Sequence, residues 1–165
     1  MMNNEIDRVT EILCHPLFVK KTEEIEEKEK DRIFCKHDLN HFLEVARIAS
    51  IINLKNGFGA DSELLYAAAL LHDIGRAEDY DHDIAGVETA KTILSDLKFN
   101  DEEVDIILEC VGHHRHDTVI DNHKVDIILE LIRQADAYSR NCFSCKAREQ
   151  CYWDENRKNK TLFIE

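Results

Sequence analysis

The chain of 165 residues is poor in the residues that interrupt helices, with one proline and five glycines. Tight turns depend on glycine and proline, so their shortage favours long, uninterrupted helices. No apolar run approaches the ~20 residues that a membrane-spanning helix needs, and the N-terminus shows no apolar signal segment. We therefore expect a cytoplasmic protein with no membrane partner.

Positive charge is also scarce, because 21 lysines and arginines stand against 34 acidic residues and leave a formal net charge of −13. Proteins that bind nucleic acid carry basic surfaces that neutralise phosphates. The charge therefore argues against a nucleic-acid polymer as partner. A small phosphorylated substrate remains compatible with it, since a bound cation can supply positive charge locally.

The length and composition indicate one domain spanning residues 1–165, because 44% hydrophobic and 33% charged residues are ordinary for a soluble globular protein. We expect a core at about 37–140, N-terminal helices within 1–33, and a cysteine-rich C-terminal extension at 141–165. Oligomeric state and substrate identity stay open at this level.

Apolar residues recur at helical spacing in six stretches, within 6–13, 39–54, 64–71, 84–97, 104–111 and 125–135. Pro16 and Gly57 are placed to separate helices, and Asn100 with Glu103 has the spacing of a capping box. The charge-rich residues 17–33 are typical of a solvated helix face, with a mobile arm as the alternative. No strand pattern precedes the short apolar finish at 162–164. The fold class predicted is all-α, a bundle of about six to eight helices.

A histidine and an aspartate, His72 and Asp73, end the apolar stretch 64–71 and are followed by Gly75. A buried imidazole and carboxylate are costly unless something binds them. Further metal-type ligands lie near the ends of other predicted helices, and side chains on facing helices of a bundle converge on metals. They are His41, His82, His113, His114 and Asp136. His37 and His123, taken singly, are interpreted as solvated.

The order of these residues resembles the HD-domain superfamily of metal-dependent phosphohydrolases. The resemblance covers roughly residues 37–140. Its matching pieces are His41-x-x-x-Val45-Ala46-Arg47, Ala68-Ala69-Leu70-Leu71-His72-Asp73-Ile74-Gly75, His82 followed by Ala85-Gly86, His113-His114, and Ala135-Asp136.

The resemblance implies two metal sites. It makes His41, His72, Asp73 and Asp136 the protein ligands of the first metal. Members that also carry histidines corresponding to His82 and to His113 or His114 bind a second metal, with Asp73 as the bridge. The motif favours His114, one helical turn after Val111, over its neighbour.

The implied activity is hydrolysis of a small phosphate ester or nucleotide by metal-activated water, with Asp73 at the centre of the chemistry. Mixed nitrogen and oxygen ligands suit one or two divalent ions of Fe, Mn, Co, Ni or Zn. Arg76 and Arg115 stand near the proposed ligands and are candidates to grip phosphate, although each could equally pair with a surface acid. Two alternatives remain: an HD-fold di-iron oxygenase, and a catalytically silent HD module that only binds a ligand.

Six cysteines and no sign of secretion favour thiols or metal ligands over disulfides. Cys142, Cys145 and Cys151 form a C-x2-C-x5-C set, and Cys35 precedes His41 by six residues, as Cys142 follows Asp136. A second metal site holding zinc or an iron–sulfur cluster is therefore conceivable. The alternative is a group of free thiols packed under the aromatic residues of the C-terminal extension.

Overall fold

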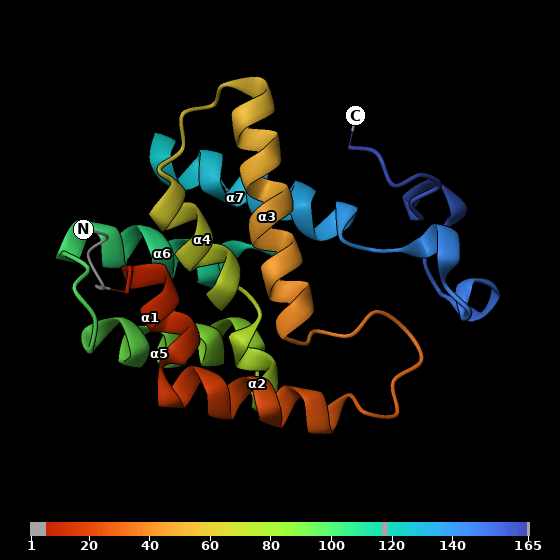
Figure 1. Ribbon diagram of the computed structural model, residues 1–165, viewed down its shortest axis with the longest axis horizontal. Helices are drawn as coiled ribbons and strands as arrows, with labels where there is room; N and C mark the ends of the chain where they lie inside the picture. The colour runs from red at the N-terminus through yellow and green to blue at the C-terminus, as the bar shows by residue number, and fades with distance from the viewer. Residues whose placement is uncertain (1–5, 117–118, 165) are drawn as a thin grey trace.

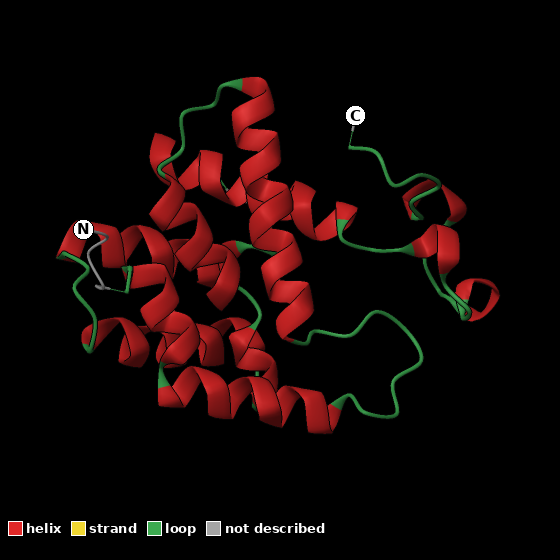
Figure 2. Cartoon of the chain, viewed as in Figure 1, coloured by secondary structure: helices red, strands yellow, loops and turns green. Residues whose placement is uncertain are grey.

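The computed structural model describes residues 6–116 and 119–164, and in these residues it contains seven α-helices and no strand (Figures 1 and 2). The prediction of an all-α bundle with six to eight helices is confirmed. The helices are α1 (Arg8–Cys14), α2 (Pro16–Lys28), α3 (Leu39–Asn56), α4 (Ser62–Leu71), α5 (His82–Ser95), α6 (Asp101–His113) and α7 (His123–Tyr138).

The helix ends follow the local signals of the sequence. Pro16 occupies the first turn of α2, where its missing N–H is not needed. Gly57 ends α3 with φ at +65°, a left-handed conformation that favours glycine. Asn100 and Glu103 form the reciprocal capping box at the start of α6.

The charge-rich stretch forms α2 as far as Lys28, with a buried face of Phe18, Thr22 and Ile25. On its outer side, Lys20 lies 3.7 Å from Glu24, whereas the largely buried Lys21 pairs with both Glu24 and Glu78. The prediction of a solvated helix face is therefore confirmed for α2. The chain then leaves the helix and runs without regular structure to the start of α3.

Helix α4 lies at the centre of the core. It contacts α1, α3, α6 and α7, and its apolar side chains from Leu64 to Leu71 are buried. Each buried leucine contributes about 2 kcal/mol of transfer free energy, so the position of this helix is strongly fixed. The residues that follow α4 directly are consequently held on a rigid support.

A short 3-10 turn, η1 (Ile74–Ala77), packs against α5 with backbone touching backbone. A Cβ atom on Gly75 would overlap the carbonyl of His82 and the amide of Gly86. Only glycine permits this approach, which brings the end of α4 next to the start of α5.

The C-terminal segment, residues 140–164, extends beyond α7 and away from α1 and α5 in Figure 1. It contains three 3-10 turns, η2 (Cys142–Ser144), η3 (Arg148–Gln150) and η4 (Glu155–Arg157). Ala147 is its one buried apolar side chain. Across the described part of the chain, no helix combines the length and apolar character needed to cross a bilayer.

Candidate metal centre

The predicted ligands lie at the ends of five helices that meet around the end of α4. His41 lies in the first turn of α3, where its backbone N–H donates to the capping carboxylate of Asp38 at 2.9 Å. His72 and Asp73 directly follow α4, and His82 begins α5. The remaining two, at the end of α6 and in the last turn of α7, are His114 and Asp136.

A first group consists of His41, His72 and Asp136, whose nearest donor atoms all lie within 4.8 Å of one another. The Nε2 atom of His41 is 3.4 Å from Oδ1 of Asp136. Asp136 is half-exposed, so this side of the group faces solvent, whereas His72 is buried.

A second group consists of Asp73, His82 and His114, again with donor atoms within 4.8 Å of one another. Oδ1 of Asp73 is 3.4 Å from Nε2 of His114 and 3.7 Å from Nε2 of His82. The two groups are joined through His72 and Asp73, which follow α4 together, and Oδ2 of Asp73 lies 3.4 Å from Nε2 of His72 in the first group.

Asp73 divides its two oxygens between the groups. Its Oδ2 lies 3.4 Å from Nε2 of His72 and 4.0 Å from Nε2 of His41, while its Oδ1 faces His82 and His114. One carboxylate oxygen for each group is the arrangement that a bridging ligand requires.

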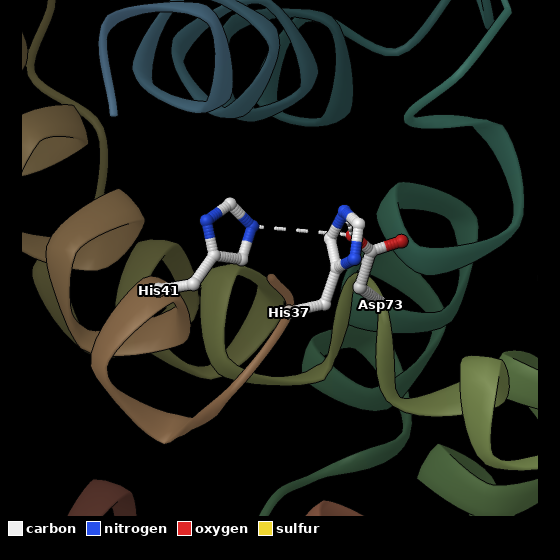
Figure 3. Close-up of side chains that lie close together, drawn as sticks. All are labelled: His37, His41 and Asp73. Atoms are coloured by element: carbon white, nitrogen blue, oxygen red, sulfur yellow. Dashed lines mark ion pairs between the residues drawn. The ribbon is translucent and has the colours of Figure 1, made fainter. Parts of the chain in front are cut away.

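His37 also faces this carboxylate, so its interpretation as a solvated histidine is wrong. Its side chain is 11% exposed, and Nε2 lies 3.8 Å from Oδ2 of Asp73 (Figure 3). Its Nδ1 lies 2.8 Å from Oε1 of Glu29, and its backbone N–H donates to the same carboxylate at 2.7 Å. The segment between α2 and α3 has no periodicity that predicts this fold-back, since the contact depends on tertiary structure.

The rings are oriented by hydrogen bonds from their second nitrogen. Nδ1 of His72 lies 2.6 Å from the carbonyl of Ala69, and Nδ1 of His114 lies 2.8 Å from the carbonyl of Val111. A carbonyl only accepts, so each Nδ1 carries the hydrogen and each Nε2 presents a lone pair to the centre. Such outer contacts fix the tautomer of metal-binding histidines.

Six buried polar atoms around the meeting point of the helices have no hydrogen-bond partner. Four of them are candidate metal donors, namely Nε2 of His41, His72 and His114, and Oδ1 of Asp73. The other two are Oδ1 of Asp83 and Nε of Arg76, which lies 2.8 Å from Oδ1 of Asp73 as an ion pair without hydrogen-bond geometry. A buried polar atom without a partner ordinarily costs about 1–3 kcal/mol, so this concentration needs an explanation. Divalent cations bound between the four candidate donors would satisfy all of them, and the donor set therefore fits a metal.

The charges favour the metal-binding form at His41 and at Asp73, whereas at His72 burial opposes protonation but the neighbouring Asp73 carboxylate raises the pKa. Burial, together with the neighbouring His72, lowers the pKa of His41 to about 4, so the His41 ring is neutral. Burial opposes ionisation of Asp73, but His72 and His114 hold the pKa of this carboxyl well below its usual range. Neutral imidazole and ionised carboxylate are the forms that bind metals.

Both predicted arginines lie beside the second group. Nε of Arg76 is 2.8 Å from Oδ1 of Asp73, and a terminal nitrogen of Arg115 is 3.2 Å from either ring nitrogen of His82. Two guanidinium groups thus stand at the edge of the donor cluster.

The structure places His113 outside the groups of close donors. Its Nδ1 lies 3.3 Å from a carboxylate oxygen of Glu109 on the same helix and 3.0 Å from the Glu109 carbonyl. Successive residues of an α-helix point about 100° apart, so only one histidine of the pair can face the centre. That residue is His114. His123 is exposed, as the sequence predicted.

One acid at the centre was missed by the sequence reasoning. Asp83 is 9% exposed, and its carboxylate lies 3.3 Å from Nε2 of both His82 and His116 and 3.8 Å from Arg115. Its position next to a predicted ligand in the first turn of α5 was the available signal. The carboxylate places negative charge behind the His82 side of the second group.

A helical bundle that presents histidine and aspartate donors at its helix ends is typical of proteins that bind metals through these residues. The HD domain family model matches residues 38–141, which is most of the chain. The chain belongs to the HD-domain family.

Similar proteins agree with this assignment. An uncharacterized protein of Clostridium beijerinckii is 38% identical over 162 residues, covering 96% of this chain and 99% of that protein. Ribonuclease Y of Listeria monocytogenes is 35% identical over 101 residues, and ribonuclease Y of Enterococcus faecalis is 31% identical over 101 residues. Each match covers 61% of this chain but only 18% of the ribonuclease. No solved structure matches the chain.

Proposed function

We propose that this protein is a metal-dependent phosphohydrolase that cleaves a small phosphate ester or nucleotide with metal-activated water. The observation that carries the proposal is Asp73, whose Oδ2 faces the unpartnered Nε2 atom of His72 and whose Oδ1 faces the unpartnered Nε2 atom of His114. Membership in the HD-domain family supports it.

The first metal would be held by His41, His72, Asp73 and Asp136, and the second by Asp73, His82 and His114. The nitrogen and oxygen donors suit Fe, Mn, Co, Ni or Zn. When bound, such ions neutralise phosphate oxygens and lower the pKa of water toward neutrality.

The protein side chains supply orientation. Asp73 links the two donor groups, one through each of its oxygens. Glu29 orients the His37 ring so that its Nε2 atom faces the Asp73 carboxylate. Arg76 and Arg115 stand at the edge of the centre, where their guanidinium groups can donate to phosphate oxygens that the metals do not neutralise. The net charge of −13 favours a small substrate that reaches this positive edge over an extended polymer.

The ribonuclease Y relatives bring RNA as a second candidate substrate. The ribonuclease Y match is 35% identical over 101 residues, which is 61% of this chain. A short RNA end could approach the half-exposed Asp136 side of the centre without an extended basic surface. RNA therefore belongs in the same substrate panel as nucleotides and sugar phosphates.

The test is elemental analysis of the purified protein, followed by assays with Mn, Fe or Zn on that panel, measuring phosphate release from phosphomonoesters and cleavage of phosphodiester bonds in nucleotides and RNA. We expect at least one metal per chain and release of phosphate from a small substrate. Asp73→Asn is expected to lower activity more than ~100-fold, because one ligand of both sites is lost. Asp105→Asn is the matched control, since it removes the same charge from an exposed position on α6.

Two outcomes would overturn the proposal. One is a metal-loaded protein that hydrolyses no phosphomonoester or phosphodiester bond in any member of the panel. The other is an Asp73→Asn variant as active and as metal-rich as the control. Oxygen consumption by the iron-loaded protein with no phosphate release would instead favour the di-iron oxygenase alternative.

A further inference from the structure

We infer that Cys35, Cys142, Cys145 and Cys151 form a separate four-thiolate metal site, of the kind that holds zinc or an iron–sulfur cluster. Cys35 lies between α2 and α3, and the other three lie in the C-terminal segment more than 100 residues later. All four nevertheless line one cavity of about 450 Å³. Four of the six cysteines of the chain are therefore brought together from two distant segments.

Short turns present the three cysteines of the C-terminal segment. Cys142 begins η2, and its carbonyl accepts the backbone N–H of Cys145 at 3.4 Å. The carbonyl of Cys145 accepts from the N–H of Arg148 at 3.2 Å, and the carbonyl of Arg148 accepts from Cys151 at 3.3 Å. Successive turns of this kind aim sulfur atoms at one point in C-x2-C metal sites.

The cavity is positive in an otherwise acidic protein. Its charged lining consists of two acids, Asp38 and Glu44, and five cations, which are Arg32, Lys36, Arg140, Arg148 and Lys158. Cations beside cysteines favour the thiolate, which is the form that binds metals. They also offset the negative charge that four thiolates keep after one divalent ion or cluster is bound.

The thiols lie close enough to oppose one another's ionisation. Burial raises the pKa of the Cys35 thiol, and the neighbouring Cys142 and Cys145 raise it further. None of the groups of donor atoms within 4.8 Å found in the described residues includes a cysteine. A single tetrahedral zinc would hold its sulfurs ~3.8 Å apart, given Zn–S bonds of ~2.3 Å. An iron–sulfur cluster spans thiolates that lie farther apart than those of a single zinc, because irons and sulfides stand between them.

The C-terminal segment lacks the core that would otherwise hold it. Ala147 is its one buried apolar side chain, while Tyr152 is 71% exposed and Phe143 is half-exposed. Phe34, Tyr152 and Trp153 line the same cavity and pack on one another, so thiols packed beside these aromatic rings are the alternative that the experiment must distinguish. Small segments without a core depend on disulfides or metals for their order, and a metal binding free energy is then also a folding free energy.

The experiment uses the full chain purified without oxygen, with metal, acid-labile sulfide and visible absorption measured on each sample. We expect either ~1 sulfur-bound zinc per chain, seen as a Zn–S distance of ~2.3 Å by X-ray absorption, or about four irons with matching sulfide and visible absorption. Cys35→Ser and Cys145→Ser are expected to lose most of this sulfur signature. The matched control is Cys14→Ser, an exposed cysteine in α1.

Asp73→Asn separates this site from the histidine and aspartate centre, because it is expected to keep the metal–sulfur signature while losing the other metals. The inference is overturned if the wild-type protein shows no metal–sulfur bond, or if Cys35→Ser keeps the full signature. If a cysteine variant is insoluble, thiol alkylation of the wild-type protein tests the site instead. A site requires that these four thiols are protected until a chelator is added, whereas immediate alkylation or a disulfide found by mass spectrometry overturns it.

Discussion

The donors of the histidine and aspartate centre lie at helix ends packed on a buried core, whereas the four cysteines lie on a loop and short turns with one buried apolar neighbour. His72 follows the most buried helix and is fixed through its own Nδ1 atom. Cys142 and Cys145 are held by backbone hydrogen bonds within residues 140–148 and by the Arg148 side chain, which donates to the Cys142 carbonyl at 2.9 Å. In the first centre the packed helices hold the donor side chains in position, whereas in the cysteine cavity the bound metal must hold them.

The two sites differ in whether the protein core or the bound metal holds the donors in place. In the first centre, the core positions the donors, and their unpartnered atoms are a cost that the core offsets. In the cysteine cavity, binding and local folding are one process. The two should therefore respond differently to metal removal, to packing defects and to loss of an outer contact.

Chelation should produce the largest contrast. We expect removal of all metals to leave the helical circular dichroism nearly unchanged, because the core contains no metal donor except at its edge. Residues 140–164 should lose protection by ~100-fold or more in hydrogen exchange, since they lack a core of their own. Hydrogen exchange with mass spectrometry measures both regions in one sample. Collapse of the helical signal, or unchanged protection of residues 140–164, would contradict the contrast.

Gly75→Ala should be the most damaging packing defect near the first centre. A methyl group there overlaps backbone atoms of His82 and Gly86, so η1 must move away from α5. We expect a loss of about 3 kcal/mol or more in unfolding free energy, together with weaker metal binding, because Asp73 and His82 are displaced. Chemical denaturation and metal titration measure the two effects.

Gly59→Ala is the matched control for strain alone. Gly59 has a positive φ of +71°, but a Cβ there meets no atom within 4 Å. We expect about 1 kcal/mol of destabilisation and unchanged metal affinity. Equal metal affinities in the two variants would show that the η1–α5 contact does not position the donors.

Much of this arrangement could be predicted from sequence where the signal is local. The periodicity of 39–54 and 64–71, with Gly57 between them, sufficed for α3 and α4, and the capping box located α6. His37 was not predicted, because its burial depends on Glu29, which lies eight residues away across an irregular segment. Asp83 was overlooked because an acid in the first turn of a helix is ordinarily a solvated capping residue.

Glu29→Gln should have a smaller effect, confined to metal affinity. The His37 contacts hold the pKa of Glu29 below its usual range although burial opposes this, so the carboxylate is ionised and orients the ring. Loss of such an outer partner typically costs 10–100-fold in metal affinity. Isothermal titration with Mn or Zn measures it, with Glu26→Gln on the exposed face of α2 as control. Equal metal affinities of Glu29→Gln and Glu26→Gln would show that the orientation of His37 does not contribute to metal binding.

Arg8→Gln should have the smallest effect and should spare both centres. Arg8 pairs with Glu63 and Glu103, and thus ties α1 to α4 and α6. Arg8 and the backbone N–H of Asn100 lower the pKa of Glu103 from 4.5. The stabilisation is therefore complete above about pH 4.5 and is lost as the pH falls through the lower folded value.

For this partly exposed network we expect about 1 kcal/mol between wild type and Arg8→Gln at pH 7, shrinking below about pH 4.5. Denaturant unfolding across the pH range measures it, while metal content stays unchanged at pH 7. If the difference in unfolding free energy between wild type and Arg8→Gln grows as the pH falls, the predicted pH dependence is wrong.

The seven residues from Cys35 to His41 supply a donor to the cysteine cavity and two rings to the neighbouring centre. Whatever enters the cavity also meets His41, which lies in its wall. Thermodynamic reciprocity then links the two sites. If metal binding in the cysteine cavity changes the metal affinity of the centre that contains His37 and His41, metal binding at that centre changes the affinity of the cysteine cavity by the same factor. A stretch of backbone shorter than two helical turns would thus let metal bound at the cysteines change how readily the histidine and aspartate centre fills.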